Sequence, residues 1–166
     1  MRSIPARRRT HSAFVLAGFL AACFLVGSVS STFSIPAIPH WYAALHKPSF
    51  NPPNGVFGPI WTLLYVLMAI AAWSISREPA SPLRSSALRI FWLQLVLNFA
   101  WSWIFFRQHH LAGALLEIVL LWLAIMAATV LFSRVSRLAA WLMLPYLAWV
   151  AFAAILNYEI WRLNPA

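Results

Sequence analysis

The stretch from Trp41 to Trp61, WYAALHKPSFNPPNGVFGPIW, decides the fold because it differs from the apolar sequence on both sides of it. It holds four of the eleven prolines and five aromatic residues. Proline fixes φ, lacks a backbone donor and disfavours helical backbone in the residue before it, so this stretch cannot be one continuous helix. Loops in water are normally polar. Because this one carries large apolar rings, we expect residues 36–56 to form an ordered, non-helical lid that packs on another part of the protein.

The composition around this stretch is that of a membrane protein. Of the 166 residues, 63% are hydrophobic and 9% are charged, whereas soluble domains have about 25% charged residues. A spanning helix needs about 20 mainly apolar residues. We therefore predict an all-α integral membrane protein, a bundle of five transmembrane helices at about 13–33, 57–76, 90–106, 111–132 and 138–160. They form a single domain over 13–164, preceded by a basic, disordered arm over 1–12, and leave no room for a soluble domain.

The first apolar run has two interpretations. Basic residues before a hydrophobic stretch also describe a signal peptide, and Leu20 to Cys23 resembles a lipoprotein cleavage box. The run nevertheless continues to about 21 residues, enough to span a bilayer. Cleavage at Cys23 would remove a helix and leave an even number of spans. We expect a retained helix, with Ser28, Ser30, Ser31 and Thr32 at its far, wetter end.

The net charge of +9 comes from basic residues in the segments between the spans. They form no surface stripe, so nucleic acid is not expected as a partner. Five spans place nine basic residues on one side: Arg2, Arg7, Arg8, Arg9, Arg77, Arg84, Arg89, Arg134 and Arg137. The other side has only Lys47, Arg107 and Arg162. The positive-inside rule then predicts a cytoplasmic N-terminus and a C-terminus outside.

Three predicted helices combine aromatic rings with isolated amides on one face, since residues three or four apart are neighbours on a helix. These faces are Trp61 and Tyr65; Gln94, Asn98, Trp101 and Phe105; and Trp149, Ala153 and Asn157. Polar groups in a bilayer point inward or into a cavity. The faces predict a pocket for a large, flat, mostly apolar ligand. The alternative is that the amides tie helices together and the rings fill the core.

Other candidate residues have weaker patterns. Glu117, the carboxylate set inside a span, is either a functional group or a structural hydrogen-bond partner. Four histidines share one side of the membrane, at positions 40, 46, 109 and 110, but no second ligand sits on a rigid helix, so we do not expect them to ligate haem. The single cysteine, Cys23, excludes an internal disulfide and a cysteine-rich metal site, and no metal site is predicted. Leu156, Tyr158 and Arg162 fit a loose sterol-binding pattern that ordinary interface anchors also fit.

Five motifs in order carry a resemblance to a known family: WYAALHKPSFNPP from Trp41, FGPIWTLLY from Phe57, QLVLNFAWS from Gln94, LPYLAW from Leu144 and LNYEIWRLN from Leu156. Over about residues 13–164 the chain resembles the translocator protein family, TspO/MBR, whose members include the tryptophan-rich sensory proteins. The resemblance implies a five-helix protein of the bacterial cell membrane, usually a homodimer in contact with membrane lipids. Tyr158-Glu159 departs from many animal members, which have a second aromatic residue there, and this weakens the implied sterol binding.

The resemblance also implies ligands: tetrapyrroles such as protoporphyrin IX and haem, sterol-like lipids in some members, and benzodiazepine-type drugs. Its members are linked to stress or tetrapyrrole regulation, as receptors or transporters, and need no cofactor. Carried onto this chain, the ligand residues are Tyr42, Pro52, Trp61, Asn98, Trp101, Trp149, Ala153 and Asn157. The helical faces add Tyr65, Gln94 and Phe105, and Trp41 adds a ring from the lid. One alternative is light- and oxygen-dependent porphyrin breakdown with a photochemical role for Trp61 and Trp149; a second is a purely structural membrane protein.

Overall fold

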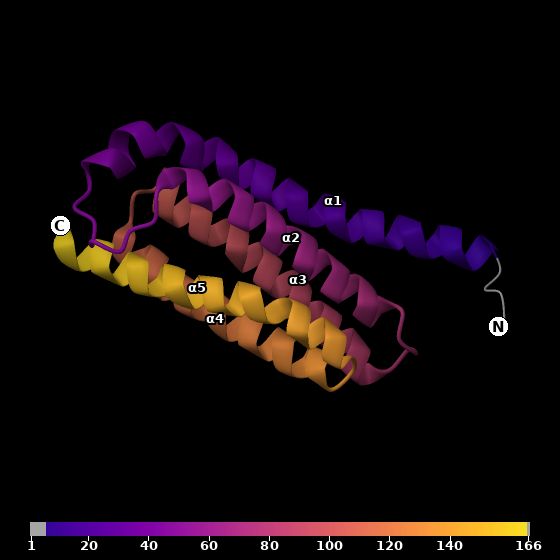
Figure 1. The fold of residues 1–166 in the computed structure, drawn as a ribbon. Helices are drawn as coiled ribbons and strands as arrows, with labels where there is room; N and C mark the ends of the chain where they lie inside the picture. The colour runs from indigo at the N-terminus through magenta and orange to yellow at the C-terminus, as the bar shows by residue number, and fades with distance from the viewer. Residues whose placement is uncertain (1–5, 166) are drawn as a thin grey trace.

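The computed structural model describes residues 6–165, which form a bundle of five long helices (Figure 1). These are α1 (Ala6–Ala37), α2 (Asn54–Ser76), α3 (Pro82–Ser102), α4 (Leu111–Ser133) and α5 (Arg137–Leu163). A π-helical turn, η1 (Ile38–Tyr42), extends α1, and another, η2 (Trp103–Arg107), extends α3. No strand occurs over 6–165, and each of the 5 helical segments is long and apolar enough to cross a membrane. The predicted all-α, five-helix class is confirmed.

Several predicted boundaries are wrong, always because a helix is longer than expected. The backbone is helical from Ala6, so the predicted disordered arm is wrong from that residue on; residues 1–5 lie outside the described part of the chain. The first helix also runs on through η1 to Tyr42 instead of ending at residue 33. The third begins at Pro82 rather than near residue 90. Proline fits the first turn, where its missing donor has no intrahelical partner, and the Ser81 hydroxyl accepts the Arg84 backbone N–H at 3.1 Å.

The predicted lid over 36–56 is correspondingly shorter. Helical backbone continues to Ala44 and resumes at Asn54, so only residues 45–53 are non-helical. Pro36 lies inside α1 and Pro39 in the first turn of η1 without ending the helix. A π-turn opens the regular hydrogen-bond ladder and thereby accommodates a residue that cannot donate. The prolines at 48, 52 and 53 follow one another too closely for this, and the chain leaves the helix there.

Side-chain bonds hold the lid in place. The Tyr42 hydroxyl donates to Asn51 Oδ1 at 2.7 Å, closing the lid on itself. Asn164, just past the end of α5, accepts the His46 backbone N–H at 3.0 Å and donates to the His46 carbonyl at 2.9 Å. The lid, the α3–α4 turn and the C-terminus therefore lie at one end of the bundle, opposite the N-terminus (Figure 1).

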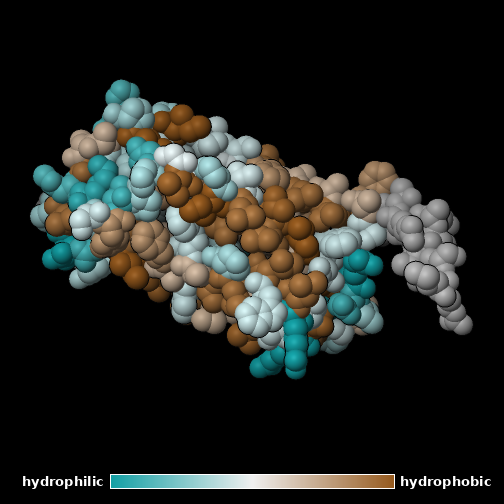
Figure 2. Space-filling model, viewed as in Figure 1, coloured by the Kyte–Doolittle hydropathy of each residue, from teal (hydrophilic) through white to brown (hydrophobic). Residues whose placement is uncertain are grey.

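The helices pack so that α4 lies against both α3 and α5, while α1 lies on the outer side against α2 and α3 (Figure 1). Small residues allow close approach in a bilayer, and α2 contributes the fully buried Ala69, Ala71 and Ala72. At Gly27 of α1, an added Cβ would lie 2.5 Å from Cε2 of Tyr65. Hydrophobic residues cover the middle of the visible face, and hydrophilic residues gather toward its ends, as a spanning bundle requires (Figure 2).

Candidate functional site

A cavity of about 540 Å³ lies between α1, α2, α5 and the end of α3 with η2, and its lining includes residues at both ends of the lid, Tyr42 and Asn54, but none of residues 45–53. Its volume falls within the roughly 300–1,000 Å³ of small-molecule sites. No residue of α4 lines it. From α1 and η1 the lining takes Phe24, Gly27, Ser28, Ser30, Ser31, Ser34, Ile35, Ile38 and Tyr42, and from α2 Asn54, Gly55, Phe57, Gly58, Trp61, Thr62 and Tyr65. From α3 and η2 it takes Trp101, Ser102, Phe105 and Phe106, and from α5 Trp149, Ala153, Leu156, Asn157 and Ile160.

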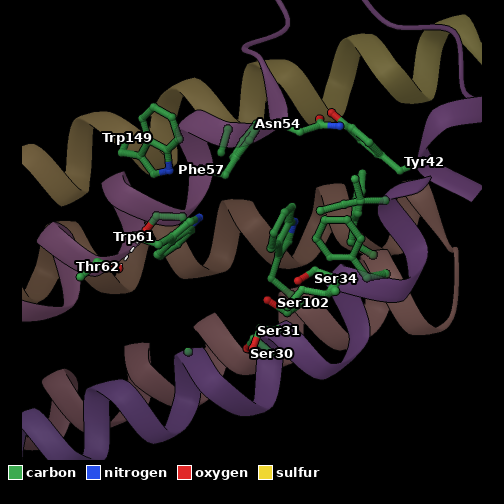
Figure 3. Close-up of a pocket in the computed structure, with 18 of the residues that line it drawn as sticks. Ser30, Ser31, Ser34, Tyr42, Asn54, Phe57, Trp61, Thr62, Ser102 and Trp149 are labelled. Carbon is green, nitrogen blue, oxygen red and sulfur yellow. Dashed lines mark hydrogen bonds between the residues drawn. The ribbon is translucent and has the colours of Figure 1, made fainter. Parts of the chain in front are cut away.

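Aromatic rings of α2 and α5 form one wall of the cavity, on which Figure 3 labels Trp61, Phe57 and Trp149. The Phe57 and Trp149 rings meet edge to face with centroids 5.9 Å apart, and Trp61 and Tyr65, one turn apart on α2, have centroids 5.5 Å apart. Such contacts fix the orientation of each ring. The wall therefore presents fixed aromatic surface to whatever enters.

The α1 wall was not among the predicted site residues. Its members recur every three or four positions from Phe24 to Ile38, so they share one face of the helix. The sequence feature that could have revealed this wall is the run of serines within an apolar span. From the sequence alone, these serines are predicted to lie at a wet end of the helix. These serines line the cavity instead, and Ser30, Ser31 and Ser34 lie across from the aromatic wall (Figure 3).

Eight of the twelve predicted ligand residues line the cavity: Tyr42, Trp61, Tyr65, Trp101, Phe105, Trp149, Ala153 and Asn157. Trp41, Pro52, Gln94 and Asn98 do not line it. Trp41 turns away and stacks on the His109 ring, with centroids 4.1 Å apart. Pro52 remains in the lid, where its carbonyl accepts from Asn51 Nδ2 at 3.1 Å.

Asn98 has a structural role that explains its distance from the cavity. Its side-chain oxygen accepts the Tyr65 hydroxyl at 3.0 Å, and its Nδ2 donates to the Tyr146 hydroxyl oxygen at 3.0 Å. One amide thus joins α2, α3 and α5 through buried hydrogen bonds. Gln94, one turn earlier on α3, is completely buried, and its amide atoms have no hydrogen-bond partner among residues 6–165.

Asn157 combines a structural role with a place in the cavity wall. Its side-chain oxygen accepts the Trp101 indole N–H at 3.2 Å, and its Nδ2 donates to the Leu111 carbonyl at 3.1 Å. These bonds tie α5 to α3 and to the first residue of α4. The orientation of Trp101 in the cavity therefore depends on Asn157.

Of the remaining candidates, all but Leu156 lie outside the cavity. Glu117 is 7% exposed, and neither carboxyl oxygen has a hydrogen-bond partner in the part of the chain that the structure describes. Of the sterol-pattern residues only Leu156 lines the cavity; Tyr158 is exposed and Arg162 pairs with Glu159 at 2.7 Å on the helix surface. Among the described residues, no three His, Cys, Asp or Glu side chains lie together as a metal site would need.

The described residues that line the cavity include no Lys, Arg, His, Asp or Glu. A basic group lies near its edge instead: the Lys47 ammonium sits 4.9 Å from the centroid of the Tyr42 ring. It donates to the carbonyls of Ala43 and Leu45 at 3.2 and 2.9 Å. An ammonium has three donors, so one is left for another partner. The site thus offers a neutral interior with one positive charge beside it.

Comparison with known proteins assigns the sequence to a family. A sequence model described as the TspO/MBR family matches residues 19–162, which include all five helices in part or whole. The chain belongs to the TspO/MBR family.

Named members of the TspO/MBR family cover nearly the whole chain. It is 40% identical over 152 residues to protein CrtK of Rhodobacter capsulatus, covering 91% of this chain and 93% of that protein. It is 40% identical over 149 residues to the translocator protein of Homo sapiens, with 89% and 88% covered. It is 37% identical over 146 residues to the tryptophan-rich sensory protein of Cereibacter sphaeroides, with 88% and 89% covered. Together with the five apolar helices, these matches make the chain a TspO-type integral membrane protein.

Proposed function

We propose that this protein is a ligand-binding sensor or transporter whose cavity takes a tetrapyrrole, protoporphyrin IX or haem, in stress or tetrapyrrole regulation. The observation that carries the proposal is the aromatic wall: Trp61, Phe57 and Trp149 line one cavity among the helices. A porphyrin offers a large flat π-surface, and aromatic side chains bind such surfaces by offset stacking or by edge contacts. The cavity also suits sterol-like lipids and benzodiazepine-type drugs, which are mainly apolar.

Two polar groups complete the proposed binding mode. The Trp149 Nε1 is buried without a hydrogen-bond partner among residues 6–165, so an acceptor on a ligand gains a full hydrogen bond where a small shift of the ring brings the two together. The Lys47 ammonium, with its third donor beside the Tyr42 ring, is placed to receive a propionate that extends past the lid. A charged ligand end therefore stays at the edge of the cavity while the ring system lies inside.

The test is a titration of the purified protein in detergent with protoporphyrin IX, haem and a sterol, followed by quenching of tryptophan fluorescence. We expect saturable quenching by both tetrapyrroles, with one site per chain. Quenching that rises linearly with every compound, as for partitioning into the micelle, would leave the structural alternative standing.

A second candidate function is light- and oxygen-dependent porphyrin breakdown. It is favoured by the indole rings of Trp61, Trp101 and Trp149, which line the same cavity and so would surround an excited porphyrin. Dioxygen is the oxidant in this chemistry and light supplies the energy. Illuminating the complex in air and under argon separates the two functions: a breakdown activity gives a new product spectrum only in air and only with intact protein, whereas a pure binder gives the bleaching of free porphyrin.

The proposed setting is the bacterial cell membrane, with the N-terminus in the cytoplasm, and the proposed assembly is a homodimer. Exposed apolar side chains such as Leu93 and Val96 of α3 face lipid or a second copy. Light scattering coupled to size-exclusion chromatography in detergent measures the protein mass; the mass of one chain would exclude the homodimer.

A further inference from the structure

We propose that Ser30, Ser31 and Ser34 of α1, with Ser102 of α3, form a subsite that binds an uncharged oxygen of the ligand, a carbonyl or a hydroxyl group. The inference rests on the proposed function, that this cavity binds a ligand. In Figure 3 these four serines lie along one side of the cavity, across from Trp61 and Trp149. The cavity thus has an aromatic wall and a hydroxyl wall.

Ser30 carries the argument because its hydroxyl is buried without a partner. The residue is 8% exposed and lines the cavity, and its Oγ has no hydrogen bond to any residue in the described part of the chain. Its neighbours on α1 behave differently: Ser31 and Thr32 each donate to the carbonyl three residues back, at 2.7 Å. That local bond is the usual way to satisfy a hydroxyl in an apolar helix. Its Oγ has almost no accessible surface in this conformation, so a rotation of the side chain brings the Ser30 hydroxyl to a ligand oxygen in the cavity.

The other three serines extend the same polar surface. Ser31 gives its proton to the Ser28 carbonyl but keeps its oxygen lone pairs as acceptors. Ser34 lies one turn after Ser30 and Ser31, so it shares their face of α1. Ser102, 8% exposed, brings a fourth hydroxyl from another helix. Hydroxyls both donate and accept, so this wall fits either a carbonyl or a hydroxyl oxygen.

The described lining carries no side chain that is charged at neutral pH, and this determines the charge of the bound group. None of the residues around the cavity is Lys, Arg, His, Asp or Glu. An ionised carboxylate against the serines would be desolvated without a counter-ion, which is far less favourable than burying a neutral oxygen. Anionic ligand groups therefore belong at Lys47 in the lid, and the serine wall takes an ester, ketone or alcohol.

A purely structural role for the serines makes a different prediction. If they serve only as small residues at the α1–α3 interface, alanine replaces them without loss, because it is also small and has the higher helix propensity. A subsite, in contrast, makes binding depend on whether the ligand carries oxygen. The two explanations are separated by comparing two porphyrins of similar shape, one with ester carbonyls and one without oxygen.

The experiment titrates full-length protein in detergent with protoporphyrin IX dimethyl ester and with etioporphyrin, which has only alkyl substituents. The variants are Ser30→Ala, the double variant Ser30→Ala with Ser34→Ala, and Thr32→Val as a matched control that removes an α1 hydroxyl outside the cavity. Loss of one or two hydrogen bonds should weaken ester binding by about fivefold in the single variant and more in the double. Etioporphyrin binding should stay within about twofold in every variant. Thr32→Val should bind both probes like the original protein.

Each contrary outcome has its own meaning. No saturable binding of either porphyrin by the original protein overturns the proposed function and this inference with it. Saturable binding that both serine variants keep unchanged overturns the subsite and leaves the proposed function intact. Equal weakening of both porphyrins also overturns the subsite, because it shows that the serines shape the cavity. If the double variant elutes as aggregate, Ser30→Ala alone decides, since replacement of one buried hydroxyl by alanine leaves the helix intact.

Discussion

The indole nitrogen of Trp101 on α3 donates to the side-chain oxygen of Asn157 on α5 across 3.2 Å, at the wall of the cavity. The same amide donates to the Leu111 carbonyl at the start of α4. A single side chain therefore fixes three helices and one aromatic ring of the site. Stability and the shape of the cavity are therefore coupled at this position.

Replacement of Asn157 by alanine should lower stability. It leaves the Trp101 N–H without a partner in an apolar interior, which costs about 1–3 kcal/mol, and it also removes the bond to the Leu111 carbonyl. Thermal unfolding in detergent, followed by circular dichroism, should show a clearly lower midpoint. Tyr158→Phe, which removes an exposed hydroxyl from the next position of α5, is the control and should not change it. An unchanged midpoint for Asn157→Ala would show that these two bonds do not hold the bundle.

The Tyr65, Asn98 and Tyr146 bridge should behave as one unit. Both tyrosine hydroxyls depend on the same amide, so Asn98→Leu removes both bonds at once and should destabilise more than Tyr65→Phe or Tyr146→Phe alone. Residues in one network show coupling energies of about 0.5–3 kcal/mol. A double-mutant cycle between Tyr65→Phe and Asn98→Leu, measured by thermal unfolding, should give a value in that range. Strictly additive effects would count against the bridge.

Gly27→Ala should destabilise the protein because the new methyl group would lie 2.5 Å from the Tyr65 ring, which packs beneath it. Overpacking of this kind costs about 1–3 kcal/mol. Gly18→Ala on the same helix is the control: nothing lies within 4 Å of its added Cβ, so it should be neutral or slightly stabilising. Thermal unfolding of the two variants side by side checks this. Equal midpoints would mean that α1 does not approach α2 this closely in the membrane.

Cysteine labelling checks the predicted orientation. In a Cys23→Ala background, Ser49→Cys lies in the lid and Ala80→Cys in the α2–α3 connection, and both positions are exposed. The charge distribution predicts that the lid lies outside and the connection in the cytoplasm. A membrane-impermeant maleimide added to intact cells should label Ser49→Cys and leave Ala80→Cys unlabelled until the cells are lysed. The reverse pattern would invert the topology.

Hydropathy predicts the five helices because each span is a continuous apolar run, a signal that does not depend on neighbouring helices. Helix ends depend on local chemistry, and the predicted helix ends are less accurate. Prolines are typical of helix ends, but Pro36 lies within α1 and Pro39 within η1, where the helix continues as a π-helical turn. The arginines at 84 and 89 suggest a loop but lie in α3, whose early turns hold charge at the end of the bundle.

In the candidate site, too, some features could be predicted from the sequence and others could not. Periodicity correctly places Trp61, Trp101 and Trp149 on inward faces, because a helix fixes which residues lie on one side. It does not distinguish a cavity from a packed core, so Asn98, which joins three helices, has the same pattern as Asn157, which lines the cavity. The serines of α1 were not predicted as lining residues, because whether they line a cavity depends on the packing of α1 against the other helices.

Trp149→Ala, titrated with protoporphyrin IX in detergent and followed by the porphyrin absorption band, tests most directly whether the cavity is a tetrapyrrole site. Trp141→Ala is the matched control: it lies on the same helix, is 69% exposed and does not line the cavity. Loss of the stacking ring and its indole N–H should weaken binding by about tenfold or more in Trp149→Ala, while Trp141→Ala binds like the original protein and both variants remain folded. Equal affinity in Trp149→Ala, Trp141→Ala and the original protein would contradict the proposal that the porphyrin binds against Trp149.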